Sequence, residues 1–303
     1  MVSLIKPEFL KPGDAVGVVA PARSISETEL IPFKELMEKE GFKVVYSKNL
    51  LGEHNQFSGS IEERVTDLHR MIMDPEVKAI FTARGGYGTA QLLLHLDWNL
   101  IRKIPKWIVG FSDASVLHAA IGKYMESIHG VMPYSFAMKE PQNDISFRHM
   151  INIIRGEEVN YNIPDHPYNF PGMVKGELIG GNLSVLYSLT GSAFEPDYDR
   201  KILFIEDLDE YVYHIDRMIM NFELRNIFQR ISGLIVGDFS DIHDNPKPFG
   251  KEALEIIAER AHKYKVPAMF GFPAGHKKNN FPLIFGRVST LTIQEGNNSL
   301  VMF

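Results

Sequence analysis

The 303-residue chain contains no cysteine and only two tryptophans. The lack of cysteine excludes disulfides and thiolate catalysis. No apolar run reaches the length of about 18 residues at which a helix can span a membrane. Residues 1–20 include lysines, prolines and an aspartate, so they lack the apolar core of a secretory signal. We therefore expect a cytoplasmic protein without a membrane segment.

Positive charge is also in short supply. The chain has 32 Lys and Arg against 38 Asp and Glu, a net charge of −6, and its basic residues are scattered. Such a chain has no basic field for nucleic acid, so a nucleic-acid partner is not expected. A hydrophobic share of 45% and a charged share of 23% are typical of a globular protein. At this length we expect two domains.

The N-terminal half repeats one unit, a short apolar strand followed by a turn and a helix. Two of the helices are expected to begin with capping boxes, Ser26 to Glu29 and Ser60 to Glu63. Another helix is expected to begin at residues 88–94. Alternation at this spacing predicts a doubly wound parallel sheet, flavodoxin-like or Rossmann-like, over residues 1–158. Ligands of such sheets gather at the carboxyl ends of the strands.

The second half differs in pattern. Residues 159–175 are rich in Pro, Asn and Asp and are expected to form a linker. Residues 176–303 then predict a smaller, mixed α/β domain, with one long helix over 211–230. Two closing strands, 288–293 and 299–303, are separated by Glu-Gly-Asn-Asn and predict a hairpin.

Ser112 stands where an apolar strand, residues 107–109, gives way to helical spacing in KWIVGFSDASVLHAAI. A serine at a strand-to-helix elbow lies beside the backbone N–H groups of the first helical turn, a pairing that acyl transfer requires. The alternative is that Ser112 only caps the helix. The next position but one is Ala114 rather than Gly, which argues against an α/β-hydrolase esterase.

The loop Arg84-Gly-Gly-Tyr-Gly88 follows the third expected strand and so lies at the same sheet edge. Its glycines allow close backbone approach to a ligand, although a plain tight turn or a phosphate loop would use them too. The spacing matches neither the P-loop nor the dinucleotide fingerprint. The first strand is followed by Pro21-Ala-Arg-Ser24, which sets aside a nicotinamide enzyme.

Two titratable residues of the second half are candidates for chemistry. Glu206 ends an apolar strand and could orient a histidine, or belong to a solvated acidic loop. His276 lies in the breaker-rich segment GFPAGHKKNN and could be a base, or a solvated loop residue. A metal site at Asp238, Asp241, His243 and Asp244 is the weaker alternative, because the spacing fits no established ligand pattern. We expect no metal and no cofactor.

The motifs occur in a defined order along the chain: GVVAPA, RGGYG, GFSD, GELIGGNL, LFIED and GFPAGH. This set resembles the LD-carboxypeptidase family of serine peptidases over nearly the whole length. The resemblance implies a Ser112, Glu206 and His276 triad, an oxyanion hole from the N–H groups of Gly86 and Asp113, and a homodimer. Because the triad residues come from both halves, the active site is expected between the domains.

The resemblance implies a cytoplasmic peptidase that removes the terminal D-alanine of murein tetrapeptides during cell-wall recycling. Two alternatives stay open, a hydrolase of aminoacyl-nucleotides like the microcin C self-immunity protein and a murein-peptide-binding protein without activity. Arg84 and Lys277 are positional candidates for binding the substrate's terminal carboxylate.

Overall fold

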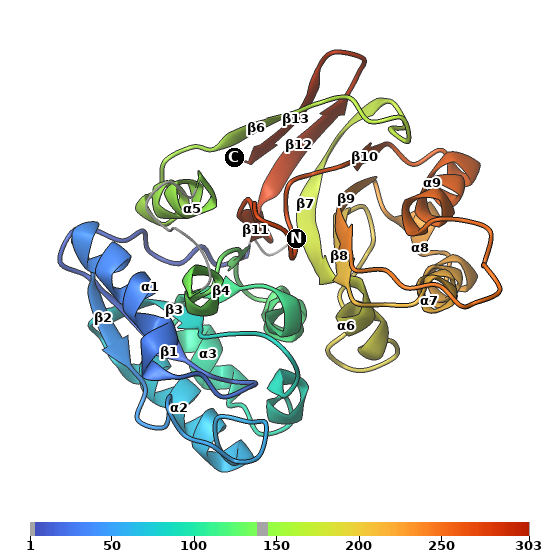
Figure 1. Ribbon diagram of the computed structural model, residues 1–303. Helices are drawn as coiled ribbons and strands as arrows, with labels where there is room; N and C mark the ends of the chain where they lie inside the picture. Colours follow the sequence, from blue (N-terminus) through green and yellow to red (C-terminus); the bar gives the residue numbers. More distant parts are fainter. Residues whose placement is uncertain (1–3, 138–144, 303) are drawn as a thin grey trace. The chain divides into compact units, whose positions relative to one another are not determined.

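The computed structural model of the protein describes residues 4–137 and 145–302. The chain divides into two compact units, Met1–Glu157 with Phe281–Leu283, and Glu158–Asn280 with Ile284–Phe303. Each unit is an α/β domain with its own sheet (Figure 1). In the ranges that the structure describes, no helix has the length and apolar character to cross a membrane.

The first unit contains a mostly parallel sheet, as the sequence predicts. Its order is β11-β5-β4-β3-β1-β2 within the described residues, and the neighbours from β5 to β2 are parallel. The strands are β1 (Ala15–Val19), β2 (Lys43–Tyr46), β3 (Val77–Thr82), β4 (Trp107–Gly110), β5 (Ser127–His129) and β11 (Leu283–Phe285), of which only Leu283 belongs to this unit. The helices are α1 (Glu27–Lys39), α2 (Ile61–Met73), α3 (Trp98–Lys103), α4 (Ser115–Ile121) and α5 (Ile145–Arg155), with 3-10 turns η1 (Thr89–Leu92), η2 (Ser112–Ala114) and η3 (Pro133–Phe136).

Local sequence accounts for these elements. All five residues of β1 are buried, as a strand covered on both faces requires. Both predicted capping boxes form: Glu29 Oε2 accepts from the Ser26 N–H at 2.8 Å, and Glu63 Oε2 accepts from the Ser60 N–H at 2.8 Å. The boxes thereby fix the starts of α1 and α2, which follow β1 and β2 in the chain.

The second unit contains a mixed sheet, again as predicted. Its order among the described residues is β10-β9-β8-β7-β12-β13-β6, parallel from β10 to β7 and antiparallel from β7 to β6. The strands are β6 (Asn160–Ile163), β7 (Gly172–Asn182), β8 (Ile202–Leu208), β9 (Gly233–Ser240), β10 (Ala268–Phe270), β12 (Val288–Ile293) and β13 (Asn298–Met302). The helices are α6 (Leu183–Ser188), α7 (Val212–Leu224), α8 (Ile227–Arg230) and α9 (Ala253–Tyr264). The expected hairpin is confirmed as β12 and β13, and its expected last residue, Phe303, lies outside the described residues.

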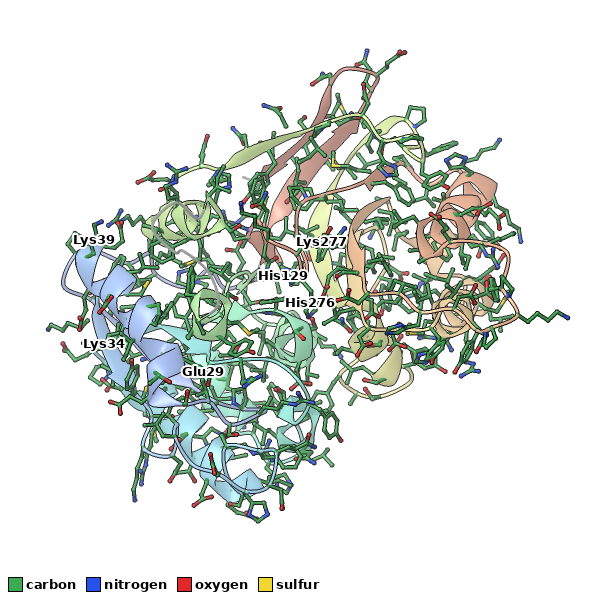
Figure 2. All side chains as sticks on the ribbon, in the orientation of Figure 1. Glu29, Lys34, Lys39, His129, His276 and Lys277 are labelled. Atoms are coloured by element: carbon green, nitrogen blue, oxygen red, sulfur yellow. The ribbon has the colours of Figure 1, made fainter. Side chains whose placement is uncertain are left out.

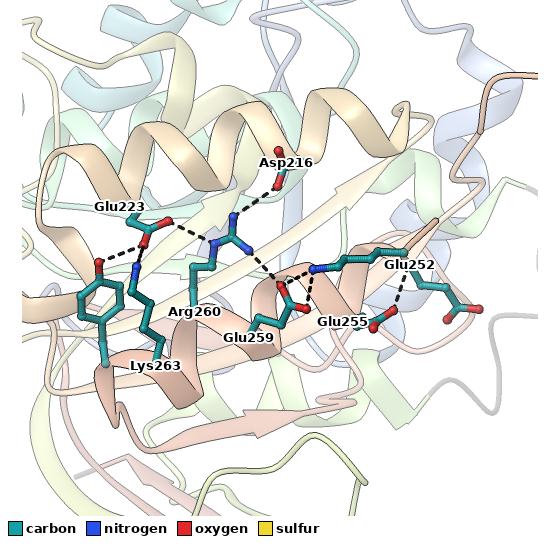
Figure 3. A network of polar contacts seen from close by, with 9 residues as sticks. Asp216, Glu223, Glu252, Glu255, Glu259, Arg260 and Lys263 are labelled. Carbon is teal, nitrogen blue, oxygen red and sulfur yellow. Dashed lines mark hydrogen bonds and ion pairs between the residues drawn. The ribbon is translucent and has the colours of Figure 1, made fainter. Parts of the chain in front are cut away.

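A polar network links α7 to α9 (Figure 3). Glu223 accepts from Arg260 Nε at 3.2 Å, from Lys263 Nζ at 2.6 Å and from the Tyr264 hydroxyl at 2.9 Å. Asp216 and Glu259 contact the same guanidinium. Networks of this kind stabilise more than isolated surface pairs because each ordered side chain serves several contacts.

Three expectations about elements are wrong. The interval 159–175 contains β6 and the start of β7, because buried Tyr161 and Ile163 alternate with exposed residues and pair with β13. The long helix over 211–230 is broken, since Asn226 has a left-handed φ of 58° between α7 and α8. Residues 88–94 form only the 3-10 turn η1, and the helix begins after Asp97, which caps α3.

Gly180 of β7 provides a stability test. Its φ is 145°, and a Cβ there would lie 2.0 Å from the Phe204 carbonyl oxygen. We expect Gly180→Ala to destabilise the second unit by about 3 kcal/mol, the sum of backbone strain and overpacking. Gly191→Ala is the matched control, because its φ is 76° but nothing lies within 4 Å, so it should cost about 1 kcal/mol. Thermal unfolding of both variants checks this, and equal losses would contradict the steric argument.

Candidate active site

Ser112 lies at the predicted strand-to-helix elbow. β4 ends at Gly110, and Ser112 begins η2 with a φ of 60°, which L-residues other than Asn and Asp rarely adopt. The N-caps are Phe111 for η2 and Ala114 for α4, so Ser112 caps neither segment. Backbone strain of about 1 kcal/mol at one residue persists only where its surroundings hold it, and such residues cluster at functional sites.

Two glycines make room for this elbow. A Cβ on Gly85 would lie 2.8 Å from Ser112 Oγ, and a Cβ on Gly110 would lie 2.1 Å from Thr82 Oγ1. Neither position can carry a side chain while the strand ends stay this close. The Arg84-to-Gly88 loop therefore packs directly against the Ser112 hydroxyl.

The side chain of Asp113 ties the elbow to the same loop. Asp113 is buried and its Oδ2 accepts from the Thr89 N–H at 2.9 Å. The carbonyl on the other side of that peptide, Gly88 O, accepts from Arg64 NH1 at 3.1 Å. Burial raises the pKa of Asp113, against the Thr89 hydrogen bond and the charges of Arg64 and Arg23. One peptide group is thus held from both ends.

Arg64 anchors the network although it is only 4% exposed. Besides Gly88 O, it donates to Pro21 O at 2.7 Å, to Gln91 Oε1 at 2.7 Å and to Gly59 O at 3.2 Å. Burial lowers the pKa of Arg64, while Asp113 raises it. The guanidinium joins the loops that follow β1 and β3.

His118 of α4 fixes the backbone before the elbow. Its Nε2–H donates to Gly110 O at 2.9 Å, and its Nδ1 accepts from Ser127 Oγ at 2.8 Å. A carbonyl can only accept, which sets this tautomer. Burial lowers the pKa of His118 to about 4, so the ring is neutral at physiological pH. His118 is a structural contact of β4 and β5.

In the second unit, Glu206 and His276 form a hydrogen-bonded pair. Glu206 lies inside β8, is fully buried and accepts from His276 Nδ1 at 2.7 Å. His276 lies on the loop after β10, where Figure 2 labels it beside Lys277. The expected solvated acidic loop is wrong for Glu206, because β8 continues to Leu208.

The loop around His276 is shaped by Gly275, whose φ is 132°. A Cβ there would lie 3.0 Å from Asp238 Cβ and 3.1 Å from Glu206 Oε2. The Gly275 N–H donates to Asn280 Oδ1 at 3.0 Å. The loop can therefore approach the buried carboxylate closely enough for the imidazole to reach it.

The charges around the pair set its protonation. Burial by itself would lower the pKa of His276, but Glu206, through charge and hydrogen bond, and then Asp207 and Asp238, raise it above its ordinary value. Burial and the neighbouring Glu206 raise the pKa of Asp207 to about 7, against hydrogen bonds from Leu208 N, Asn182 Nδ2 and Ser184 N. The imidazolium of His276 is the stabilised form.

Family models match both halves of the chain. The LD-carboxypeptidase N-terminal domain matches residues 16–130, and the LD-carboxypeptidase C-terminal domain matches residues 175–291. The chain belongs to the LD-carboxypeptidase family. The resemblance found in the sequence motifs is confirmed.

Relatives of this family member match over nearly their full length. A probable murein peptide carboxypeptidase of Bacillus subtilis is 34% identical over 96% of this chain and 92% of its own. A murein tetrapeptide carboxypeptidase of Pseudomonas aeruginosa is 30% identical, covering 93% of both chains. The crystal structure of a muramoyltetrapeptide carboxypeptidase from Oxalobacter formigenes has a TM-score of 0.87 at 26% identity, covering 95% of this chain and 98% of that one.

The microcin C7 self-immunity protein of Escherichia coli is also related. It is 27% identical over 95% of this chain and 93% of its own. The relatives of this LD-carboxypeptidase family member thus include both murein peptide carboxypeptidases and a microcin self-immunity protein.

Both positional candidates for binding the substrate carboxylate, Arg84 and Lys277, contact other groups of the protein. Arg84 NH1 donates to Ser24 O at 3.3 Å, lies 3.9 Å from Glu29 Oε1, and its guanidinium covers the Tyr134 ring at 4.0 Å. Lys277 Nζ lies 3.3 Å from Asp238 Oδ1. Each cation has a partner of its own.

The metal alternative finds no support in the contacts. His243 Nε2 is bonded to Asp209 Oδ1 at 2.6 Å, and Asp244 accepts from the N–H groups of Asn245 and Phe249. Among residues 4–137 and 145–302, no group of three His, Asp or Glu side chains is placed to hold a metal ion.

Sequence reasoning missed Arg23, Arg64 and the carboxylate of Asp113 as parts of the site. A signal existed only for Arg23, which lies three residues after the expected strand 15–20 and so belongs to the ligand-binding edge of the sheet. Arg64 lies inside a predicted helix, where nothing in the spacing marks it.

The protonation argument can be tested by NMR titration of the histidine rings. His276 should titrate above about 6.5, the ordinary midpoint. Glu206→Gln removes the negative charge that favours the imidazolium, so protonation then needs more acid and the His276 midpoint should fall.

His118 is the internal control, since its ring should stay neutral at pH 5 in both proteins. His276→Gln identifies the resonance. An unchanged His276 midpoint in Glu206→Gln would show that the carboxylate does not control this ring.

Proposed function

We propose that this chain is a serine carboxypeptidase that cleaves the L,D peptide bond before the terminal D-alanine of murein tetrapeptides. The observation that carries the proposal is the hydrogen bond between buried Glu206 and His276 Nδ1 in a member of this peptidase family. A carboxylate that accepts from Nδ1–H holds the ring in the tautomer whose Nε2 can act as a base, as a serine peptidase needs.

In this mechanism Ser112 is the nucleophile and His276 its general base. His276 takes the hydroxyl proton as Ser112 attacks the scissile carbonyl, and then gives it to the leaving amine of D-alanine. Glu206 holds the tautomer and stabilises the imidazolium. The N–H groups of Gly86 and Asp113 would bind the oxyanion, and water then releases the acyl group from Ser112.

The unusual backbone of Ser112 supports its assignment as nucleophile. A φ of 60° lifts the residue out of the regular path from β4 into α4, and its Oγ lies against the Gly85 position. Ser115, the other serine of this segment, is fully buried at the first position of α4. A buried hydroxyl has no access to a substrate.

The substrate class is supported by the relatives, which include a probable murein peptide carboxypeptidase, a murein tetrapeptide carboxypeptidase and a muramoyltetrapeptide carboxypeptidase. A role in cell-wall recycling, a cytoplasmic location and a homodimer belong to the same proposal. The catalytic groups named here are protein side chains and backbone, so the mechanism uses no cofactor.

Hydrolysis of aminoacyl-nucleotides is the second candidate, favoured by the related microcin C7 self-immunity protein. The nucleobase of such a substrate would need an aromatic side chain on which to stack. Tyr211 is 44% exposed, and its ring lies 5.6 Å from both Tyr213 and His243. Aromatic rings can stack on any base, so a substrate comparison has to decide.

Ser112→Ala should lower kcat by at least about 10³-fold, the scale for loss of a triad nucleophile. Ser115→Ala should stay within about tenfold, because it removes only a buried hydroxyl. The measurement is D-alanine release followed by mass spectrometry, with circular dichroism of both variants as the folding control. The reverse ranking would overturn the choice of nucleophile.

The two substrate classes can be compared directly with the purified protein. L-Ala-γ-D-Glu-diaminopimelate-D-Ala should have a kcat/KM at least about tenfold above that of an aminoacyl sulfamoyl-adenosine, within the discrimination that a binding site can supply. Release of D-alanine and of the amino acid are both measured by mass spectrometry. A preference for the adenosine compound would place the protein in the microcin branch, and binding without turnover of either would indicate a binding protein.

A further inference from the structure

Arg23 occupies the ligand-binding edge of the first sheet. It lies four residues after the end of β1, and its backbone forms an antiparallel bridge with Phe57. The next N–H, that of Ser24, donates to Gln56 O at 3.2 Å. The backbone that carries the guanidinium is therefore held in place, and only the side chain is free to move.

The side chain of Arg23 lies directly over Gly86. A Cβ on Gly86 would be 2.5 Å from Arg23 Cδ, 2.7 Å from Nε and 2.8 Å from Cγ. The φ of Gly86, 106°, also favours glycine there. Because the Gly86 N–H is the proposed oxyanion donor, the arginine stem runs beside the place where the scissile carbonyl would lie.

The charge of Arg23 is available, unlike that of its neighbours. Arg64 is spent on backbone carbonyls, and Arg84 on Ser24 O, Glu29 and the Tyr134 ring. Within the part of the chain that the structure describes, Arg23 makes no hydrogen bond or ion pair, and it is exposed. Its field still reaches the elbow, since it lowers the pKa of Asp113.

We propose that Arg23 binds the free C-terminal carboxylate of the peptide, and so makes this protein an exopeptidase. The inference rests on the proposed function. When a single residue is removed, the terminal carboxylate belongs to the residue next to the scissile carbonyl, at a Cα separation of about 3.8 Å. The cation that binds it must lie beside the oxyanion donors, where Arg23 lies. Its planar fork matches a carboxylate in two parallel hydrogen bonds.

The test measures kcat/KM for the tetrapeptide and for its C-terminal amide, and takes their ratio. The wild-type protein should prefer the acid strongly. Arg23→Gln should lower kcat/KM for the acid by about 10- to 100-fold, the scale of a hydrogen bond to a charged group, and leave the amide nearly unchanged. The ratio should therefore collapse towards one, with most of the change in KM.

Two further variants make the test specific. Arg23→Lys keeps the charge but not the fork, so it should restore part of the ratio. Arg102→Gln on α3 is the matched control, an exposed arginine that lies over the Tyr124 ring, and it should keep the wild-type ratio. Circular dichroism shows that each variant is folded.

The outcomes separate the two proposals. If the wild-type protein releases D-alanine and prefers the acid, but Arg23→Gln keeps that preference, the Arg23 assignment is overturned while the proposed function stands. Collapse of the ratio in Arg84→Gln or Lys277→Gln instead would assign the carboxylate to those cations. A wild-type protein with no activity on the tetrapeptide refutes the proposed function and the Arg23 assignment together.

Discussion

The left-handed backbone of Ser112 is the constraint on which the first unit's site depends. An L-residue other than Asn or Asp adopts φ near 60° only at a cost of about 1 kcal/mol, so the surrounding contacts must impose it. Gly110 and Gly85 allow the close packing around it, because a Cβ on Gly110 would clash with Thr82 and a Cβ on Gly85 would clash with Ser112. The Asp113 carboxylate then anchors the residue after it to the Thr89 N–H.

The same contacts link the two segments that carry the proposed oxyanion donors, the N–H groups of Gly86 and Asp113. Arg64 holds the Gly88 carbonyl while Asp113 holds the N–H of the same peptide group, and Asp113 is itself the residue that follows Ser112. The loop after β3 and the turn after β4 are therefore linked by a buried hydrogen bond. Preorganised donors cost no reorganisation when charge develops on a substrate, which is why rigid loops suit oxyanion binding. The buried guanidinium is stabilised mainly by carbonyl oxygens, with Asp113 as the nearby negative charge.

The second unit solves a different electrostatic problem. Glu206 and Asp207 are adjacent, both buried, and two like charges in a strand are costly. Glu206 bonds the His276 ring through Oε2, whereas its Oε1 has no partner within the described residues. Asp207 is surrounded by N–H donors of Asn182, Ser184 and Leu208. The negative charges of Glu206 and Asp207 stabilise the imidazolium of His276. The imidazolium is the charge state that a general base must reach during the reaction.

Elements that depend on local sequence patterns could be predicted from the sequence, whereas elements that depend on contacts between distant residues could not. The mostly parallel first sheet, the mixed second sheet, both capping boxes and the elbow at Ser112 followed from local rules, because strands buried on two faces and box residues have fixed spacings. The break at Asn226 and the strand β6 did not, since each depends on contacts made elsewhere in the chain. The pairing of Glu206 with His276 was inferred from the family resemblance, because 70 residues separate them and no periodicity connects them.

Arg23 marks the limit of that reasoning most clearly. In the sequence it belongs to the segment Pro-Ala-Arg-Ser, from which we could infer only that the dinucleotide fingerprint is absent there. Its position gains meaning only when Gly86, which is 63 residues away, is found beneath its stem. A Cβ on Gly86 would clash with the Arg23 side chain, and a Cβ on Gly85 would clash with Ser112. The loop Arg84-to-Gly88 therefore packs against both side chains. The glycines of the RGGYG motif are thus explained by what packs against them, the Ser112 hydroxyl and the Arg23 side chain.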